Sequence, residues 1–231
     1  VEAGYVALGS ADGGLLALPF DKRRARPTGP PVAIARDVSQ PDGYSSRAGV
    51  ALTGAVVYIQ GGGTLPRELL LVSRTGQARR ITGDARLFTQ PRVSPDGRRV
   101  AIGISNGNTQ AKDVWVLDVL QQTWSRLTTD GISDRPIWTP DGRRVIYSRN
   151  DDLWWIAADG SGRPDSPEVA NGSRYGGAVT ADGHTVIYHE IESERAGIRR
   201  LALSPIGTSE RLLPGNFGEA VPTLSADGHW L

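Results

Sequence analysis

Residues 90–103 read QPRVSPDGRRVAIG, and residues 135–148 read RPIWTPDGRRVIYS. Both stretches consist of a short apolar run, a Pro-Asp-Gly turn and a second apolar run. Glycine adopts positive φ angles without steric cost, and proline presets φ at the first position of a turn, so both residues favour a tight hairpin connection. Each stretch therefore predicts a β-hairpin, and the near-identity of the two predicts a repeated unit.

The turn recurs along the chain at a nearly constant spacing. Asp-Gly pairs stand at residues 96–97, 141–142, 182–183 and 227–228, which places their glycines 45, 41 and 45 residues apart. Residues 49–59 form a weaker copy, which keeps the apolar runs but lacks the aspartate. Two further apolar runs follow each hairpin before the next one begins. Four short strands in each period of this length are typical of an all-β fold, the β-propeller of four-stranded antiparallel blades.

The two ends of the chain are expected to share one blade. Residues 5–21 match the second and third strands of a unit, residues 31–35 match its fourth strand, and residues 220–231 supply a first strand. This joining predicts a single propeller domain over residues 1–231, with five blades at residues 1–37 plus 219–231, 45–83, 88–129, 133–171 and 175–214. A fragment of a larger ring is the open alternative. A closed ring is expected to be monomeric, because closure removes exposed sheet edges.

Large aromatic side chains fall on the predicted strands. Tyr58, Tyr147 and Tyr188 share one repeat position, and Trp115, Trp138 and Trp154 also lie within apolar runs. Large flat side chains bury much apolar area, so these residues are predicted to pack between neighbouring blades.

Composition excludes several classes of function. The chain carries 26 basic and 25 acidic residues, a net charge of +1, which argues against binding to nucleic acid. It has no cysteine, so a disulfide, a thiolate zinc site and a cysteine nucleophile are excluded. No run of about 18 apolar residues is present, so we expect no membrane insertion by this segment. Long amphipathic stretches between the strands are also missing, which argues against a parallel α/β fold.

The repeated hairpins carry a family resemblance. Residues 90–104 (QPRVSPDGRRVAIGI) and 134–162 (DRPIWTPDGRRVIYSRNDDLWWIAADGSG) resemble the TolB-like, WD-type propeller repeat of bacteria. The same repeat type occurs in tricorn-type proteases and in propellers attached to bacterial serine/threonine kinases, and the two ends of this chain resemble the kinase-associated group. The resemblance implies a bacterial protein and an extracytoplasmic, periplasmic location more than a cytoplasmic one. It implies no ligand, because the matching residues are turn and core positions.

Three motifs formally match catalytic or metal sites. Residues 103–107 (GISNG) match G-x-S-x-G, but a nucleophile elbow needs a following helix and a strand follows here, which favours a hairpin loop. Residues 149–153 (RNDDL) offer three oxygen side chains for calcium without the alternate spacing of a calcium loop, so a solvated turn is preferred. His184 and His229 share a repeat position, and equivalent positions diverge around a ring, which argues against a zinc site. We therefore predict no catalytic residue, metal or cofactor.

Binding is expected at one face of the ring. Loops held by a rigid scaffold commonly carry function, and a residue that breaks the repeat beside the channel is a candidate. The loops that precede the first strand of each blade span residues 87–90, 131–135, 172–176 and 215–219. The candidate ligand-binding residues are Asp134, Arg135, Arg174, Tyr175, Phe217 and Glu219. The alternative is structural, with Asp134 and Arg135 satisfying loop amides and each other.

Two classes of function follow from this organisation. The first is a non-enzymatic binding or sensing module of a longer bacterial protein, with a protein, a peptide or a small ligand at one face and with no nucleic acid. The second is the substrate-gating propeller of a prolyl-oligopeptidase-like or tricorn-like peptidase, whose catalytic domain lies outside this chain.

Overall fold

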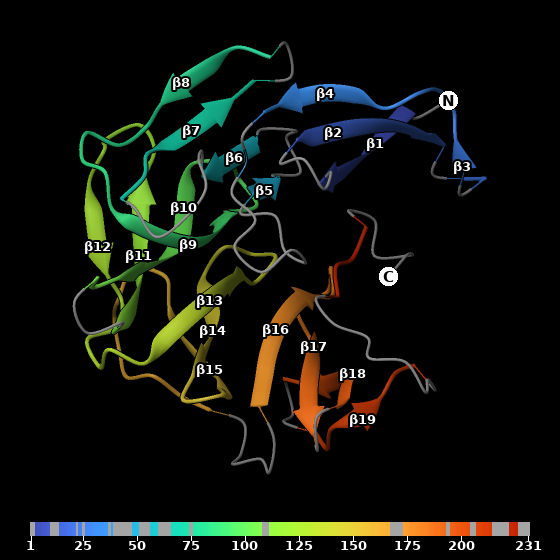
Figure 1. The fold of residues 1–231 in the computed structure, drawn as a ribbon. Helices are drawn as coiled ribbons and strands as arrows, with labels where there is room; N and C mark the ends of the chain where they lie inside the picture. Colours follow the sequence, from blue (N-terminus) through green and yellow to red (C-terminus); the bar gives the residue numbers. More distant parts are fainter. Residues whose placement is uncertain are drawn as a thin grey trace.

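The fold is all-β throughout the part of the chain that the structure describes. The computed structural model describes residues 3–9, 14–21, 23–24, 26–36, 38, 48–50, 56–59, 66–73, 76–107, 111–166, 173–192, 195–203, 207–213 and 222–225. Over these residues it contains nineteen strands and no helix. The strands form five antiparallel sheets arranged in a ring, which confirms the predicted β-propeller (Figure 1).

The sheets follow one another in chain order. The first contains β1 (Ala3–Gly9), β2 (Leu15–Asp21), β3 (Arg26–Pro27) and β4 (Val32–Ala35). The second contains β5 (Ala48–Val50), β6 (Val56–Ile59), β7 (Leu69–Val72) and β8 (Ala78–Arg80). The third contains β9 (Leu87–Val93), β10 (Arg99–Ser105), β11 (Lys112–Asp118) and β12 (Trp124–Arg126). The fourth contains β13 (Ser133–Trp138), β14 (Arg144–Arg149) and β15 (Asp152–Ala157), and the fifth contains β16 (Ser173–Val179), β17 (Thr185–Glu192), β18 (Arg195–Ala202) and β19 (Glu210–Arg211).

In the second to fifth sheets, the first strand lies on the inside of the ring. Strands β5, β9, β13 and β16 contact one another in that order, and each pairs with the next strand of its own sheet. In the fourth sheet, the place of a fourth strand is taken by a single bridge from Trp155 to Asp165. In the first sheet, β1 and β2 form a hairpin and β4 pairs with β2, as expected for the second, third and fourth strands of a blade.

Residues 222–225 lie beside the fifth sheet without forming a strand. Pro222 is buried, and its ring and carbonyl group fill the space in front of Gly177 on β16. The carbonyl group of Pro91 on β9 fills the corresponding space in front of Gly49 on β5. The predicted closing strand continues into residues 226–231, which lie outside the described residues, so the joining of the two ends stays a prediction.

The core is divided among the junctions between sheets. Each of the four buried apolar clusters draws residues from two neighbouring sheets. Tyr58, Tyr147 and Tyr188 are buried in three of these clusters, and Trp138 lies in the same cluster as Tyr147. The prediction that these aromatic side chains pack between blades is therefore confirmed.

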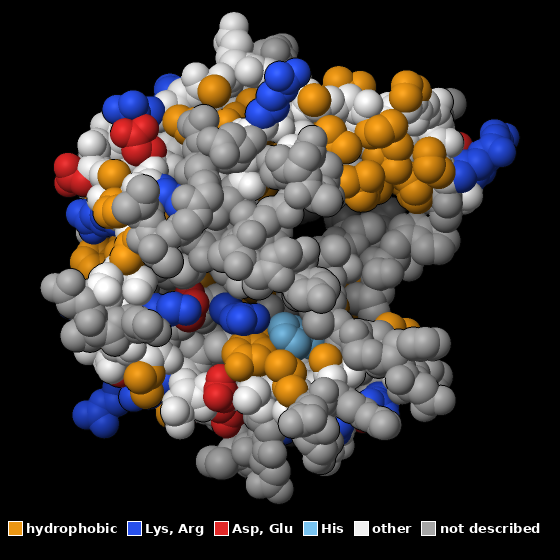
Figure 2. Space-filling model, in the orientation of Figure 1, with side chains coloured by type: hydrophobic (Ala, Val, Ile, Leu, Met, Phe, Trp, Pro, Cys, Tyr) orange, Lys and Arg blue, Asp and Glu red, His pale blue; other side chains and the backbone are white. Residues whose placement is uncertain are grey.

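Four of the eight exposed large apolar side chains of the described residues lie on the first sheet. Tyr5 is 69% exposed and Val32 is 59% exposed, and Val6 and Leu8 on β1 are exposed as well. Figure 2 shows hydrophobic side chains gathered over this sheet. Burial of apolar area stabilises a blade, so this sheet gains less from packing than the three sheets from β5 to β15.

The repeated Asp-Gly turn is closed by side-chain hydrogen bonds. The Ser94 hydroxyl donates to Asp96 Oδ1 at 2.6 Å, and the same oxygen accepts the Arg98 backbone N–H at 3.1 Å. Ser94 Oγ also accepts the Arg99 N–H at 2.9 Å, and Gly97 has a φ of 74°. The residue two positions before the aspartate is thus part of the turn, and this explains why a serine or threonine recurs there.

Two further turns repeat this arrangement. Thr139 donates to Asp141, and Thr180 donates to Asp182, each at 2.6 Å. In each turn the hydroxyl bond is the largest cause that lowers the pKa of the carboxyl group, and the backbone N–H bond adds to it. The ionised aspartate is therefore the form that the folded chain favours.

We expect the Asp141→Asn variant to respond less to acid than the natural chain. A carboxyl group whose pKa is lowered by folding adds stability above its unfolded pKa of about 4, and this contribution disappears as the pH falls through the folded pKa. The difference in unfolding free energy between the natural chain and Asp141→Asn should thus shrink between pH 7 and pH 3. Urea unfolding at both values measures it, with exposed Asp84→Asn as the control. An unchanged difference would contradict the proposed role of the ionised turn.

We expect Gly177→Ala to lower the unfolding free energy by about 1–3 kcal/mol, because a new methyl group would collide with Pro222. Gly83→Ala is the matched control, since nothing lies within 4 Å of the place its methyl group would take. Urea unfolding compares the two. Equal stability of both variants would show that residues 222–225 do not pack on β16 in solution.

Candidate functional site

The candidate residues that the structure describes lie where the inner strands begin. Residues 87–90 belong to β9, residues 133–135 to β13 and residues 173–176 to β16. The sequence-based interpretation of these three segments as loops is therefore wrong at these residues. The physical reason is that each inner strand continues past an irregularity in its pairing, so the hydrogen-bonded ladder resumes beyond the predicted end of the strand.

Two of these irregularities have the same backbone geometry. Gln90 on β9 has a φ of 46° and Arg135 on β13 has a φ of 54°, and a proline follows each of them. A left-handed conformation costs a residue other than glycine about 1–2 kcal/mol, and a following proline restricts the backbone further. Arg135 is thus held in an unusual conformation by the two ladder segments on either side of it.

Asp134 ties three strands together. Its Oδ1 accepts the Thr89 hydroxyl of β9 at 2.6 Å, and its Oδ2 lies 3.0 Å from the Lys112 ammonium at the start of β11. The carboxylate and Thr89 also fill the space in front of Gly103 on β10. Asp134 therefore has a structural role, but its partners are Thr89 and Lys112 and not Arg135.

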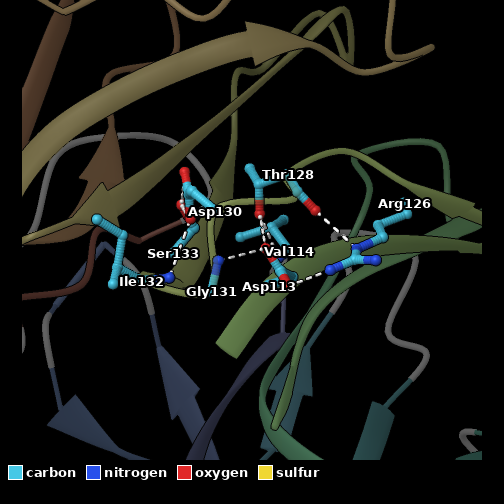
Figure 3. Close-up of polar contacts among 8 residues, drawn as sticks. All are labelled: Asp113, Val114, Arg126, Thr128, Asp130, Gly131, Ile132 and Ser133. Atoms are coloured by element: carbon cyan, nitrogen blue, oxygen red, sulfur yellow. Dashed lines mark hydrogen bonds and ion pairs between the residues drawn. The ribbon is translucent and has the colours of Figure 1, made fainter. Parts of the chain in front are cut away.

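The segment that leads into β13 is held by a second carboxylate network. Figure 3 shows Asp113 between Arg126, Thr128 and Gly131. Asp113 lies 2.6 Å from the Arg126 guanidinium and accepts the Thr128 hydroxyl at 3.0 Å and the Gly131 backbone N–H at 3.1 Å. This network fixes the segment before β13 and so places Arg135.

Asp130 completes the same segment. It accepts the Ile132 N–H at 3.0 Å and the Ser133 hydroxyl at 2.8 Å, contacts that are also drawn in Figure 3. Its second oxygen lies 2.9 Å from Nε of Arg149, whose guanidinium stacks on Trp154. Both acidic groups before β13 are therefore satisfied within the chain.

Arg174 is a structural brace. Its Nε lies 2.8 Å from Glu190 Oε1, and its Nη1 lies 3.7 Å from Asp152. Glu190 is buried and also pairs with Arg199 at 3.0 Å. The guanidinium of Arg174 is thus occupied by carboxylates of its own sheet and of β15, which supports the structural alternative for this residue.

Tyr175 and Arg135 meet across the boundary between two sheets. The Arg135 guanidinium lies 4.2 Å from the centroid of the Tyr175 ring, and the Tyr175 hydroxyl donates to Asp151 at 2.7 Å. The His189 ring lies 5.0 Å from the same tyrosine ring. Burial and, second to it, the charge of Arg135 lower the pKa of His189 to about 4, so the imidazole is neutral at pH 7.

Among the described residues, the G-x-S-x-G match at residues 103–107 forms no catalytic site and residues 149–153 form no calcium site. Ser105 ends β10, Asn106 donates its N–H to Ala111, and a strand follows, as predicted for a hairpin loop. Asn150 and Asp151 have φ angles of 47° and 65°, which form the tight turn between β14 and β15. No group of three or more His, Cys, Asp or Glu side chains in the described part could hold a metal ion.

Sequence reasoning missed Arg92, Lys112 and His189, which share this end of the ring. Arg92 could have been found, because it takes the place of Ile137 and Ala178 when the Asp-Gly turns are aligned. The contacts of Lys112 and His189 depend on strand register, which the sequence does not give. Phe217, Glu219 and His229 lie outside the described residues, so their predicted positions stay predictions.

The chain is similar to known proteins in sequence and in structure. No family model matches the chain. The Tol-Pal system protein TolB of Francisella tularensis subsp. holarctica is 22% identical over 159 residues, which cover 67% of this chain and 37% of that protein. The crystal structure of TolB from Acinetobacter baumannii superimposes with a TM-score of 0.72 at 18% identity, over 98% of this chain and 55% of that one.

The chain folds as a TolB-like β-propeller. It spans about a third of the length of the curated relative that it matches. Propellers of peptidases are also similar: Porphyromonas gingivalis dipeptidyl peptidase 4 superimposes with a TM-score of 0.56 at 11% identity, over 97% of this chain and 39% of that one. In the described part of this TolB-like propeller, no helix has the length and apolar character needed to cross a membrane.

We expect Asp134→Ala to lower the unfolding free energy by about 1–2 kcal/mol, because Thr89 and Lys112 would lose their shared partner. Glu210→Ala removes a carboxylate from the exposed Arg200–Glu210 pair and should change stability by less than about 0.5 kcal/mol. Urea unfolding of both variants makes the comparison. A neutral Asp134→Ala variant would contradict the structural role of this carboxylate.

Proposed function

We propose that this TolB-like propeller is a non-enzymatic binding module, which takes a peptide or protein segment at the end of the ring where β9, β13 and β16 begin. The observation that carries the proposal is the stacking of the Arg135 guanidinium on Tyr175 across two sheets. Tyrosine and arginine are the side chains that most often dominate the energy of protein interfaces. Here both side chains start from strands, so little conformational entropy is lost when they bind a partner.

The surroundings of this pair support the proposal. Asp113, Asp130 and Asp134 hold the backbone before and beside Arg135, and Asp151 holds the Tyr175 hydroxyl. A preorganised site of this kind binds better than one on a loose loop. The similarity to TolB proteins further supports an extracytoplasmic location, and a closed ring is expected to be monomeric.

Binding of immobilised peptides tests this proposal. We expect some peptides of an array with varied sequences to bind the natural chain, and we expect Arg135→Ala and Tyr175→Ala each to weaken this binding at least tenfold, or about 1.4 kcal/mol. Arg143→Ala is the matched control, because Arg143 is an exposed arginine at an Asp-Gly turn. Binding that responds equally to all three substitutions, or to none of them, would contradict this location.

A second candidate is the gating propeller of a peptidase. The similarity to dipeptidyl peptidase 4 supports it. Under this candidate, the longer natural protein cleaves peptides and this chain alone does not. Hydrolysis of a mixed peptide substrate by the longer protein, compared with this chain, separates the two functions. No hydrolysis by either would favour the binding module.

A further inference from the structure

We propose that Arg92 and Arg135 form an anion subsite between β9 and β13, which takes a carboxylate group of the bound ligand. The inference names the chemistry of the proposed binding site and rests on that function for the rest of the ligand. It comes from a difference between the charged side chains at this end of the ring. The acidic groups there have partners within the chain, whereas these two arginines have no carboxylate partner among the described residues.

Each of these acidic groups has a partner within the chain. Their recorded partners are Arg126 for Asp113, Arg149 for Asp130, Lys112 for Asp134, Tyr175 for Asp151, and Arg174 for both Asp152 and Glu190. Arg199 is a second partner of Glu190. Among the described residues, the ion pairs at this end of the ring thus involve other basic side chains, and neither Arg92 nor Arg135 pairs with a carboxylate.

Arg135 offers its donors to a ligand. Its recorded contact is the stacking of the guanidinium on the face of Tyr175, at 4.2 Å from the ring centroid. A guanidinium carries its five N–H donors around its edge, so stacking through the face leaves those donors available. A carboxylate fits two such donors in parallel.

Arg92 lies on β9, beside the strand β13 that carries Arg135. Its one recorded hydrogen bond runs from Nη1 to the carbonyl oxygen of the preceding residue, Pro91, at 3.2 Å. Burial lowers the pKa of Arg92, and the charge of Arg135 lowers it further. Two partly buried like charges on neighbouring strands repel each other, and a bound anion would lower the cost of this repulsion.

His189 supplies a reporter beside this subsite. Its ring packs on Tyr175, and its low pKa keeps it neutral at pH 7, so it adds no charge of its own. An anion on Arg135 would offset the repulsion that this arginine exerts on the imidazolium form. Ligand binding should therefore raise the pKa of His189.

The repeat shows that this charge does not belong to the scaffold. When the blades are aligned on their Asp-Gly turns, the position of Arg92 holds Ile137 and Ala178, and the position of Arg135 holds Gln90 and Gly176. Isoleucine, alanine and glycine complete the other blades, so the fold requires neither arginine. Both departures occur on the adjacent inner strands β9 and β13.

Histidine NMR of the complete chain tests the subsite. The probes are N-acetyl-aspartate amide, its uncharged asparagine analogue and inorganic phosphate, at low ionic strength. We expect the aspartate probe to shift the His189 ring resonance in a saturable way, while exposed His184 serves as the internal control. Arg92→Gln and Arg135→Gln should each weaken the response at least tenfold, whereas Arg143→Gln should leave it unchanged.

Several outcomes would overturn the proposal. An equal response to the asparagine analogue would show that binding does not depend on charge. A response to phosphate without a response to the aspartate probe would show that the subsite does not bind a carboxylate. A response that survives both glutamine substitutions would place the ligand elsewhere. If the aspartate probe binds the Glu219→Gln variant but not the natural chain, the counter-ion of the two arginines is Glu219 of the chain itself.

Two controls keep the result interpretable. Urea unfolding of the variants establishes that each one folds, and Arg135→Lys keeps the charge while it removes the forked donors, so an intermediate loss of binding is expected. Peptide-array binding that persists without any carboxylate preference would overturn this inference and leave the proposed binding function standing. If array binding is lost while the response to the aspartate probe persists, the proposed binding function is overturned and the anion subsite stands.

Discussion

A carboxylate two residues after a serine or threonine closes the turn between the first two strands in three of the five sheets. The hydrogen bonds of this turn fix the register of the hairpin, because the hydroxyl also accepts a backbone N–H five residues later. Once the register is fixed at the turn, the residues of the inner strand between the turn and the bulge have determined partners on the second strand, as Arg92 has in Ala101. The positions of Asp134, Arg135 and Tyr175 depend in addition on the bulge.

The turn also determines where strain is placed. The ladder begins in register at the turn, and it is in register again at the start of the inner strand, so the extra residues between them must leave the ladder. Gln90 and Arg135 occupy this place with positive φ angles, directly before a proline. A bulge re-aims the side chains beside it, and the two ladder segments prevent its relaxation. The same geometry therefore carries a neutral glutamine in one blade and, in the next, an arginine that has no carboxylate partner among the described residues.

The sequence predicts the fold well and the site only in part. The recurrence of the Asp-Gly turn is a local signal, and it identifies the hairpins, the ring and the buried position of Tyr147 and its equivalents. The turn chemistry does not reveal where an inner strand begins, because the bulge interrupts the apolar pattern, and residues 133–135 therefore read as a loop. Contacts such as that of Lys112 with Asp134 join residues 22 positions apart, and they depend on register and on the packing of neighbouring sheets.

Charge distinguishes the residues that hold the fold from those that we propose to bind a ligand. The chain as a whole is nearly neutral, yet neutrality over 231 residues says nothing about a single position. At the beginning of β13 the acidic groups pair with Arg126, Arg149 and Lys112, and each pair holds the backbone in place. Arg92 and Arg135 have no such carboxylate partner among the described residues, and the charge of Arg135 lowers the pKa of Arg92. A feature that costs stability and lies outside the repeat is better explained by a ligand than by the architecture.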